Sequence, residues 1–592
     1  MNKRILFLSL LAFILFRVLY LDRDLPPGEN TRFGQKDEQA YNFTALNLYH
    51  FGSLSKPVAD RYVIQGSIKF ILNNSFTYAS LVIFGNNYYG LRIGAVLASV
   101  LVFLLIFHLL GLDAAAIAEK DKKFIQFLVY MSLLLDFGFM VASRNAAPTI
   151  FRCLYLLLVM AYVDYLTKLP WRKQWFHFYL LGIACSLLIF FSYLTNAFIL
   201  AGVFLFIVVK GFLEREIKKT LAALSLLLAG ALTGAILANW VYGFFGNTGI
   251  RTSVANTFTV YSSRVTSLQR GVSSGSFLAV LIRSGIRKTV SLLSSNLFLL
   301  NFTFLFFVIL SWGNTLYLVA KRKLPNCVQL LSFTLILAYA IQAFFYNPDS
   351  SKWIVLMLPV FLISVVLNVI GSHENWRRGI LPGNGMGIVI RWGFLSLAGV
   401  LLVFRLFYVG LSAEFQGLVV LSFVIMLAAM VAWHGKRFLL NKKALPVVLL
   451  LTLLPNAILS IKYSIVKPEF HYRDACIAID KIVGDKRMAG VWTDGFRLYT
   501  QGNAFFPWYQ VQHRERHIKG LFEIFERELA DFTVDFPSGD FFDVERDIGD
   551  KGRNFRLQRV ASFYLGKGAL GQSIWLYKRI DKNDQDKQGR RP

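Results

Sequence analysis

The sequence predicts an α-helical polytopic membrane protein that carries a small C-terminal α/β domain outside the membrane. Three observations carry this prediction: 55% of the 592 residues are hydrophobic, only 17% are charged, and the mean hydropathy is +0.51. Because a soluble domain has about 25% charged residues, the composition excludes one large soluble enzyme. The 43 Gly, 15 Pro and 4 Cys also exclude collagen-like, disordered and disulfide-rich classes.

The net charge is +28, and its distribution argues against a nucleic-acid partner. Residues 465–592 contain 22 Lys and Arg against 19 Asp and Glu, so nearly all of the excess lies among the apolar segments before them. Basic loops between apolar spans are what membrane topology requires. We therefore predict membrane lipids as partners and no nucleic acid.

Apolar windows of about 17–25 residues, long enough to cross a bilayer, predict about 13 transmembrane helices. They cover residues 4–21, 88–110, 124–142, 149–167, 176–193, 195–210, 220–245, 296–320, 328–346, 352–370, 390–410, 415–434 and 445–464. Residues 61–84 are apolar only in patches, and we predict an interfacial segment there. Arg17 interrupts the first span and is expected to extend its charge to the outer surface.

The basic residues of the short loops predict the orientation. With the N-terminus inside, the cytoplasmic segments carry 22 Lys and Arg, whereas the four short outer loops carry only Arg144 and Lys352. Since basic loops stay in the cytoplasm, we predict a cytoplasmic N-terminus and an extracytoplasmic (periplasmic) C-terminal domain. The absence of long eukaryotic-style insertions favours the inner (plasma) membrane of a bacterium.

Three outer segments are longer than connections need to be: residues 22–87, 246–295 and 465–592. The last of these alternates a helical pattern with short strand patterns, at Asp474–Val483, Met488–Trp492, Phe532–Phe536 and Ser573–Tyr577. We predict a membrane domain over 1–464, an outer soluble α/β domain over 465–580 and a disordered tail over 581–592.

The first outer loop contains the acidic pair Asp37 and Glu38. The pair opens a run with helical apolar spacing, Glu38–Phe51, which stops at Gly52. A helix dipole keeps acids in its first turn ionised, and an ionised carboxylate can act as general base for a hydroxyl acceptor. The alternative is an ordinary N-cap with a first-turn acid, which many helices carry.

The second long outer loop, 246–295, is basic and contains no acid. Its cations are Arg251, Arg264, Arg270, Arg283, Arg287 and Lys288. Arginine matches the geometry of phosphate oxygens, which favours phosphate recognition. An interfacial helix over Phe277–Lys288, lying on anionic lipid headgroups, explains the same charges.

Asp136 is an acid inside an apolar span, where ionisable groups usually have a function. It lies within two turns of Arg144 in the sequence, so a structural ion pair explains it as well. The outer histidines, His50, His471, His513 and His517, lack the spacing of metal ligands. We therefore predict no metal site.

Several short motifs, in order along the chain, resemble the C-type glycosyltransferase superfamily (GT-C). The first-loop run from Asp37-Glu38 to Tyr41 is similar to its acidic loop motif. Phe84-Gly85 with Leu91-Arg92, Ser143-Arg144, and Lys352-Trp353 followed by Leu358-Pro359 resemble later ones. The protein O-mannosyltransferases and the lipid A aminoarabinose transferases have the most similar pattern, and 13 spans with an outer C-terminal domain also fit.

The resemblance implies an inverting transferase that moves a hexose or pentose from a polyprenyl-phosphate-linked donor. The acceptor would be an envelope lipid, glycan or protein at the outer surface. Asp37 would be the general base and Glu38 its support. Lys352, Arg144, Arg61, Arg92 and Arg264 would neutralise the donor phosphate. The mechanism implies no cofactor, although the related oligosaccharide transferases use a divalent metal, and the basic loop would act as a lid.

The chain departs from the GT-C pattern at three positions. Tyr62–Gly66 replaces a Pro-Pro-rich segment, Thr149 stands where many members have an Asp, and Lys352 stands where Arg is commoner. Two other classes of function fit the spans. A transporter or flippase of a lipid-linked or anionic solute would use Asp136 as a proton relay, and a non-catalytic envelope scaffold would need no acidic pair.

Overall fold

The chain divides into two compact units in the computed structural model. The first contains Met1–Leu19, Val96–Ser143 and Thr149–Val466, and the second contains Tyr20–Ala95, Arg144–Pro148 and Lys467–Pro592. The structure describes residues 3–23, 42–54, 56–59, 62–64, 70–111, 119–192, 194–244, 301–345, 350–367, 413–434, 451, 453–466, 470–490, 498, 504–505, 521–535, 548, 554–564 and 573–581. Each unit is defined by the contacts among its residues, and each contains segments that are distant in the sequence.

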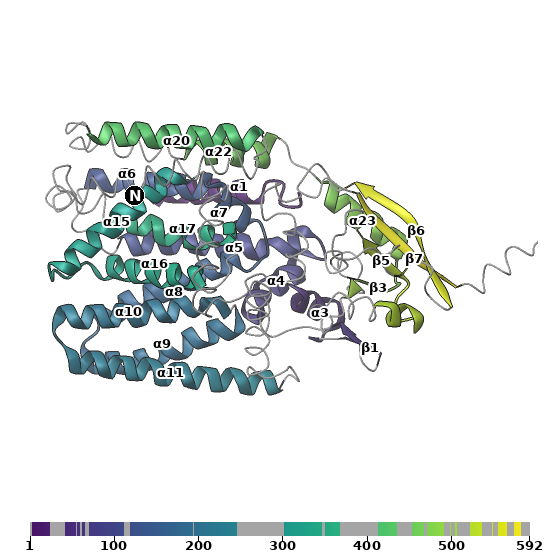
Figure 1. Cartoon of the computed structure of the whole chain (residues 1–592), viewed down its shortest axis with the longest axis horizontal. Helices are drawn as coiled ribbons and strands as arrows, with labels where there is room; N and C mark the ends of the chain where they lie inside the picture. Colours follow the sequence, from purple (N-terminus) through teal and green to yellow (C-terminus); the bar gives the residue numbers. More distant parts are fainter. Residues whose placement is uncertain are drawn as a thin grey trace, which may run out of the picture. The chain divides into compact units, whose positions relative to one another are not determined.

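The first unit is helical throughout its described residues. Its helices are α1 (Lys3–Val18), α6 (Glu119–Leu135), α7 (Phe137–Ser143), α8 (Thr149–Lys168), α9 (Trp171–Phe191), α10 (Ala197–Glu214), α11 (Ile217–Phe244), α15 (Phe302–Ala320), α16 (Cys327–Phe345), α17 (Ser350–Val365), α20 (Ala413–His434) and α22 (Leu454–Ile461). The last part of α5 (Tyr88–Gly111) also belongs to it. In Figure 1 the helices α9, α10 and α11 run alongside one another.

Six described helices are long and apolar enough to cross a membrane, and the bent pair α6 and α7 would make seven. The described residues therefore support a multi-pass membrane protein but do not reach the predicted 13 spans. The predicted span 390–410 lies outside the described residues. Others, such as α1 and α17, coincide with apolar helices shorter than a full span.

Helices α9 and α11 pack closely because glycines face the contact. A Cβ added at Gly182 of α9 would collide with the carbonyl oxygen of Leu227. One added at Gly230 of α11 would collide with the carbonyl oxygen of Tyr179. Small residues allow helix backbones to approach in a membrane, where packing replaces the hydrophobic effect as the source of association.

The predicted span 124–142 is broken at Asp136, where α6 and α7 meet at an angle of 67°. Arg17 supplies donors to the end of α6, since its guanidinium bonds to Leu133 O (2.6 Å) and Leu134 O (3.2 Å). The Asp136 carboxylate accepts from Phe139 N at 2.7 Å and so caps the start of α7. Side chains at the break therefore supply hydrogen bonds to backbone groups that apolar surroundings would leave without partners.

Two sequence expectations about these side chains need correction. Arg17 does not reach a surface, because its side chain is completely buried and lies over the ring of Phe13, 4.6 Å from the centroid. Its guanidinium instead donates to the carbonyl groups of Leu133 and Leu134 at the end of α6. Asp136 acts as a cap, and the cation that attracts it is Arg17.

The second unit combines the first long loop, which follows α1, with the C-terminal segment. Its helices and strands are α3 (Phe43–Phe51), β1 (Lys56–Ala59), β2 (Tyr62–Ile64), α4 (Ile71–Phe84), the start of α5, α23 (His471–Val483), β3 (Met488–Ala489), β4 (Ala504–Phe505), β5 (Phe532–Asp535), β6 (Phe555–Tyr564) and β7 (Ser573–Asp581). Strands β1 and β2 form an antiparallel pair. Segment 61–84, predicted to be interfacial, therefore contains a strand and a separate helix.

A five-stranded sheet of order β4-β3-β5-β7-β6 forms the C-terminal part of this unit (Figure 1). The predicted helix and three strands of the tail are confirmed as α23, β3, β5 and β7. The long strand β6, with Arg556, Gln558 and Arg559 among its apolar residues, was not predicted. Helix α23 covers the sheet with Tyr472, Cys476, Ile479 and Val483, a spacing of three and four residues that defines one helix face.

The C-terminal segment and the first loop share one core. Leu498 is completely buried in a cluster with Ala45 and Leu46 of α3, Leu81 of α4, Tyr88 and Leu91 of α5, and Ala146. Phe51, at the end of α3, packs against a second cluster built mainly from the C-terminal segment. The two segments therefore stabilise each other although more than 400 residues separate them in the sequence.

Candidate functional site

The predicted site residues differ in what the structure describes of them. Asp37, Glu38, Arg61 and Arg264 lie outside the described residues. Lys352 belongs to α17 by its backbone, but its side chain lies outside the described part. Arg92 and Arg144 are described, and both are buried, with exposures of 1% and 2%.

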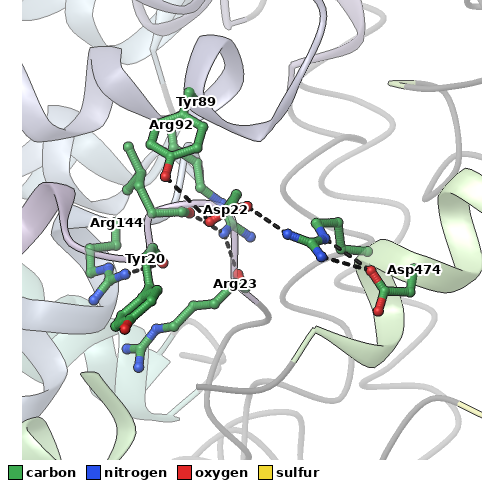
Figure 2. A network of polar contacts seen from close by, with 9 residues as sticks. Tyr20, Asp22, Arg23, Tyr89, Arg92, Arg144 and Asp474 are labelled. Atoms are coloured by element: carbon green, nitrogen blue, oxygen red, sulfur yellow. Dashed lines mark hydrogen bonds and ion pairs between the residues drawn. The ribbon is translucent and has the colours of Figure 1, made fainter. Parts of the chain in front are cut away.

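Arg92 and Arg144 converge on one turn, Tyr20–Arg23, at the start of the second unit (Figure 2). The guanidinium of Arg92 donates to Leu21 O at 2.7 Å and to Arg23 O at 2.5 Å. Arg144 donates to Tyr20 O. The sequence therefore identified two cations that do lie close together, and each holds the backbone of the same four residues.

The turn is bent tightly. Arg23 N donates to Tyr20 O at 3.2 Å, and Tyr20 has a φ of 50°. A side chain larger than glycine adopts this left-handed conformation at a cost of roughly 1–2 kcal/mol. Such a residue persists where its surroundings fix it, and the bond from Arg144 to Tyr20 O supplies one such constraint.

Arg23 is a third buried arginine at this turn, and the sequence analysis did not single it out. Its exposure is 3%, and burial, together with the neighbouring charge of Arg92, lowers its pKa to about 9. The guanidinium is still charged at neutral pH. In the sequence it is one basic residue between Asp22 and Asp24 after a span, which gives no signal of burial.

Asp22 connects the turn to the C-terminal segment. Its carboxylate pairs with Arg473 of α23, with 2.6 Å between Nη1 and Oδ2, and accepts a long hydrogen bond of 3.4 Å from the hydroxyl of Tyr89. Arg473 also pairs with Asp474 at 2.9 Å. Burial alone would lower the pKa of Arg473, but hydrogen bonds to Asp474 and Asp22 raise it, so the cation is secure.

A buried amide network fixes the chain just after the predicted acidic pair. Asn42 donates to Ala146 O at 2.8 Å and accepts from the hydroxyl of Thr77 at 2.7 Å. Ala45 N donates to Oδ1 of Asn74 at 3.0 Å. Position 42 is therefore fixed beside the segment Arg144–Pro148, which supplies Arg144 to the turn.

Helix α3 begins at Phe43, five residues after Glu38, with no acid in its first turn. The expectation of acids within the first turn of this helix is therefore wrong. The side chain of Asn42 is engaged with Thr77 and Ala146, and it makes no capping bond. The predicted end is confirmed, since Gly52 has a φ of 65° and donates its N–H to Leu48 O.

The arrangement places three buried guanidinium groups around four residues of backbone. Guanidinium groups match carboxylate and phosphate oxygens and hold them through charge-assisted bonds. Arg23 and Arg144 extend away from Asp474 in Figure 2. Arg473 of the C-terminal segment instead pairs with Asp22. A site of this kind suits an anionic group such as a phosphate. Within the described residues no three His, Cys, Asp or Glu come close enough to hold a metal ion.

No known protein family and no curated protein matches the chain by sequence. Its fold, a multi-pass helical membrane unit with a small C-terminal sheet, does match solved structures. The apo structure of ArnT from Cupriavidus metallidurans has a TM-score of 0.50 at 12% identity and covers 97% of each chain. The structure of ArnT bound to undecaprenyl phosphate has a TM-score of 0.51 at 14% identity, over 96% of this chain and 97% of that one.

The oligosaccharyltransferase of Archaeoglobus fulgidus is more distant, with a TM-score of 0.47 at 12% identity over 90% of this chain and 69% of that one. The two ArnT structures show that the present chain has the same fold along nearly its whole length. The helical membrane fold with a small C-terminal sheet, which the GT-C resemblance implied, is therefore confirmed, and the predicted count of 13 spans is not. At this level of identity, the match concerns the fold and not the residues of the site.

Proposed function

We propose that the protein is an inverting membrane glycosyltransferase that moves a sugar from a polyprenyl-phosphate-linked donor to an envelope lipid, glycan or protein. The observation that carries this proposal is the fold shared over nearly both full lengths with ArnT, which was solved with undecaprenyl phosphate bound. The group of buried arginines at the Tyr20–Arg23 turn supports it, because a lipid phosphate needs a cationic site.

In the proposed reaction, Asp37 removes the proton from the acceptor hydroxyl while Glu38 supports it. The hydroxyl oxygen attacks the anomeric carbon, the bond between sugar and phosphate breaks, and polyprenyl phosphate leaves. Lys352, Arg144, Arg61, Arg92 and Arg264 are the proposed cations around that phosphate. Charge that develops on the leaving phosphate is stabilised by such preorganised donors.

We further propose the bacterial inner membrane as the location, with the N-terminus in the cytoplasm and the C-terminal domain outside. The proposed organisation keeps a membrane domain over 1–464, the outer domain over 465–580 and a tail over 581–592. The asymmetry of basic residues between the two sets of short loops supports this orientation.

The first test is sugar transfer from radiolabelled polyprenyl-phosphate sugars to an envelope extract, with wild type compared with Asp37→Asn. We expect transfer to fall at least about a hundredfold, as is usual when a general base is lost. The matched control is Glu523→Gln, which removes a charge from a half-exposed ion pair with Arg527. Equal transfer by wild type and Asp37→Asn would reject Asp37 as the base.

Asp136→Asn separates the enzyme from a proton-coupled transporter. The asparagine oxygen can still accept from Phe139 N, so we expect transfer per folded molecule to stay within about threefold of wild type. Activity is normalised to monodisperse protein, because losing the charge near Arg17 costs stability. If Asp136→Asn abolishes a measured solute flux, the transporter is favoured. Its cap at the single described break argues for a structural role.

A further inference from the structure

The Tyr20–Arg23 turn receives contacts from three distant parts of the chain. Arg92 and Arg144 hold its carbonyl groups, and the C-terminal segment contacts its side chains. Arg473 pairs with Asp22, and the ring of Phe470 lies edge-on to Tyr20 with 6.5 Å between centroids. The C-terminal segment therefore contacts the two residues of the turn that Arg92 does not hold.

The contact from the C-terminal segment is itself preorganised. The guanidinium of Arg473 lies 4.3 Å from the centroid of the Phe470 ring, which fixes its direction. A second carboxylate, that of Asp474, holds the same guanidinium from the other side. One cation thus connects α23 to the turn through Asp22.

The conformation of the turn needs such support. Tyr20 has a strained backbone, and charged Arg23 is buried, which costs free energy. A turn that carries both features is stable only when several contacts fix it. The C-terminal segment supplies two of these contacts: Arg473 of α23 pairs with Asp22, and Phe470 packs against Tyr20. A change in that segment can therefore alter the conformation of the turn.

We propose that Arg473 is a positioning residue for the donor: through Asp22 it holds the Tyr20–Arg23 turn so that Arg23 presents its cation to the phosphate of the lipid-linked sugar. This inference rests on the proposed function and assigns to the C-terminal segment a part in donor binding. Arg473 touches neither donor nor acceptor. It acts on the affinity for the lipid phosphate because it fixes a cation that binds it.

The charges favour the donor over the acceptor as the substrate affected. Arg23 belongs to the Tyr20–Arg23 turn, Arg92 and Arg144 bond to its carbonyl groups, and the phosphate is the anionic group that every polyprenyl-phosphate donor shares. A change at Arg473 should therefore alter the KM for the donor and leave the KM for the acceptor unchanged.

The test compares Arg473→Ala and Arg473→Lys with the control Arg527→Ala. Arg527 lies on the same segment and pairs with Glu523 at 3.6 Å, with both side chains 39% exposed. Two quantities are measured on the full-length protein in detergent: the dissociation constant for undecaprenyl phosphate, and amide hydrogen exchange in the peptide that covers residues 19–24. Kinetics with a lipid-linked donor give the KM and kcat.

We expect Arg473→Ala to weaken undecaprenyl phosphate binding about two- to fivefold, the range expected for a partly exposed ion pair that acts through one neighbour. Exchange in the turn should accelerate, Arg473→Lys should restore part of the affinity, and Arg527→Ala should match wild type. Unchanged binding and exchange in Arg473→Ala would overturn the inference while the proposed function stands. Failure of the wild type to bind undecaprenyl phosphate would reject the proposed donor, and the inference with it.

Discussion

Three of the five buried arginines in the described part of the chain bond to backbone carbonyls. Arg17 donates to Leu133 and Leu134, Arg92 to Leu21 and Arg23, and Arg144 to Tyr20. A guanidinium has five N–H donors in a fixed plane, so one side chain can satisfy two carbonyls and still offer donors to an anion. An arginine that holds the backbone can therefore still bind the phosphate of the proposed donor.

Arg23 predicts a specific pH dependence of donor binding. Its pKa, lowered by burial to about 9, keeps it charged from pH 6 to 8, so affinity for undecaprenyl phosphate should not change through Arg23 over that range. As the pH rises through about 9, the charged fraction of Arg23 decreases, and affinity should decrease with it. Arg23→Gln should bind more weakly at neutral pH and lack this alkaline decline, as measured by titration with the lipid at each pH.

Stability gives the control for this prediction. Because the pKa of Arg23 is lower in the folded protein than in the unfolded chain, folding is penalised below pH 9 and the penalty disappears as pH rises. Arg23→Gln should therefore unfold at a slightly higher temperature than wild type at pH 7. A lower unfolding temperature together with weaker binding would indicate a purely structural arginine.

At the scale of the elements, a break and a close contact show how helices without polar faces are fixed in place. The break between α6 and α7 is held by Arg17, Asp136, Asn456 and Ser460. The contact between α9 and α11 depends instead on the absence of side chains at Gly182 and Gly230. Hydrogen bonds thus fix the bend between α6 and α7, and glycines allow the short distance between α9 and α11.

The close contact can be tested at Gly230. Gly230→Ala places a methyl group against the carbonyl of Tyr179. Because moving the backbone is energetically costly, we expect the free energy of unfolding to fall by about 1–3 kcal/mol. The measurement is the thermal unfolding of purified protein in detergent. Gly243→Ala in the same helix is the matched control, because a Cβ there meets nothing within 4 Å and alanine favours a helix. Equal losses at both positions would contradict the packing argument.

At the scale of the whole molecule, the segments of the second unit share one core and are not separate pieces. The second unit takes residues from the first loop, from Arg144–Pro148 and from the C-terminal segment. The cluster around Leu498 contains side chains from all three of them. A change in the C-terminal segment is therefore expected to reach the helix that follows the acidic pair.

Leu498→Ala tests this shared core. Removing a fully buried leucine side chain should cost about 2–5 kcal/mol. Hydrogen exchange should accelerate in α3 and α4 as well as near position 498. The comparison is Leu529→Ala, at a partly buried position of the other cluster, where the effect on α3 should be smaller. Exchange that changes only in the C-terminal segment would show that the two parts fold independently.

The sequence was sufficient for the elements whose pattern is local. Apolar windows located most helices of the first unit, Gly52 marked the end of α3, and the spacing in the tail located α23 and three strands. Local patterns could not give contacts between distant residues. Nothing around Arg17 indicates that it bonds to α6, and nothing around Leu498 indicates that it packs against α3.

The sequence predicted only some residues of the candidate site. The resemblance to GT-C enzymes named Arg92 and Arg144, and the structure brings both to the Tyr20–Arg23 turn. Arg23, Asp22 and Arg473 were missed, because burial and pairing across hundreds of residues leave no mark on a single sequence. The predicted roles of Asp37, Glu38, Lys352, Arg61 and Arg264 stay predictions.

The break at Asp136 also has a consequence for biosynthesis. Asn456 accepts from Phe137 N, and Ser460 donates to Leu135 O, across separations of 319 and 325 residues. The ribosome makes these two partners long after it has made α6 and α7, and backbone groups without partners are costly in lipid. Arg17 and the Asp136 cap can therefore hold the break first, and the bonds to Asn456 and Ser460 are added when α22 is made.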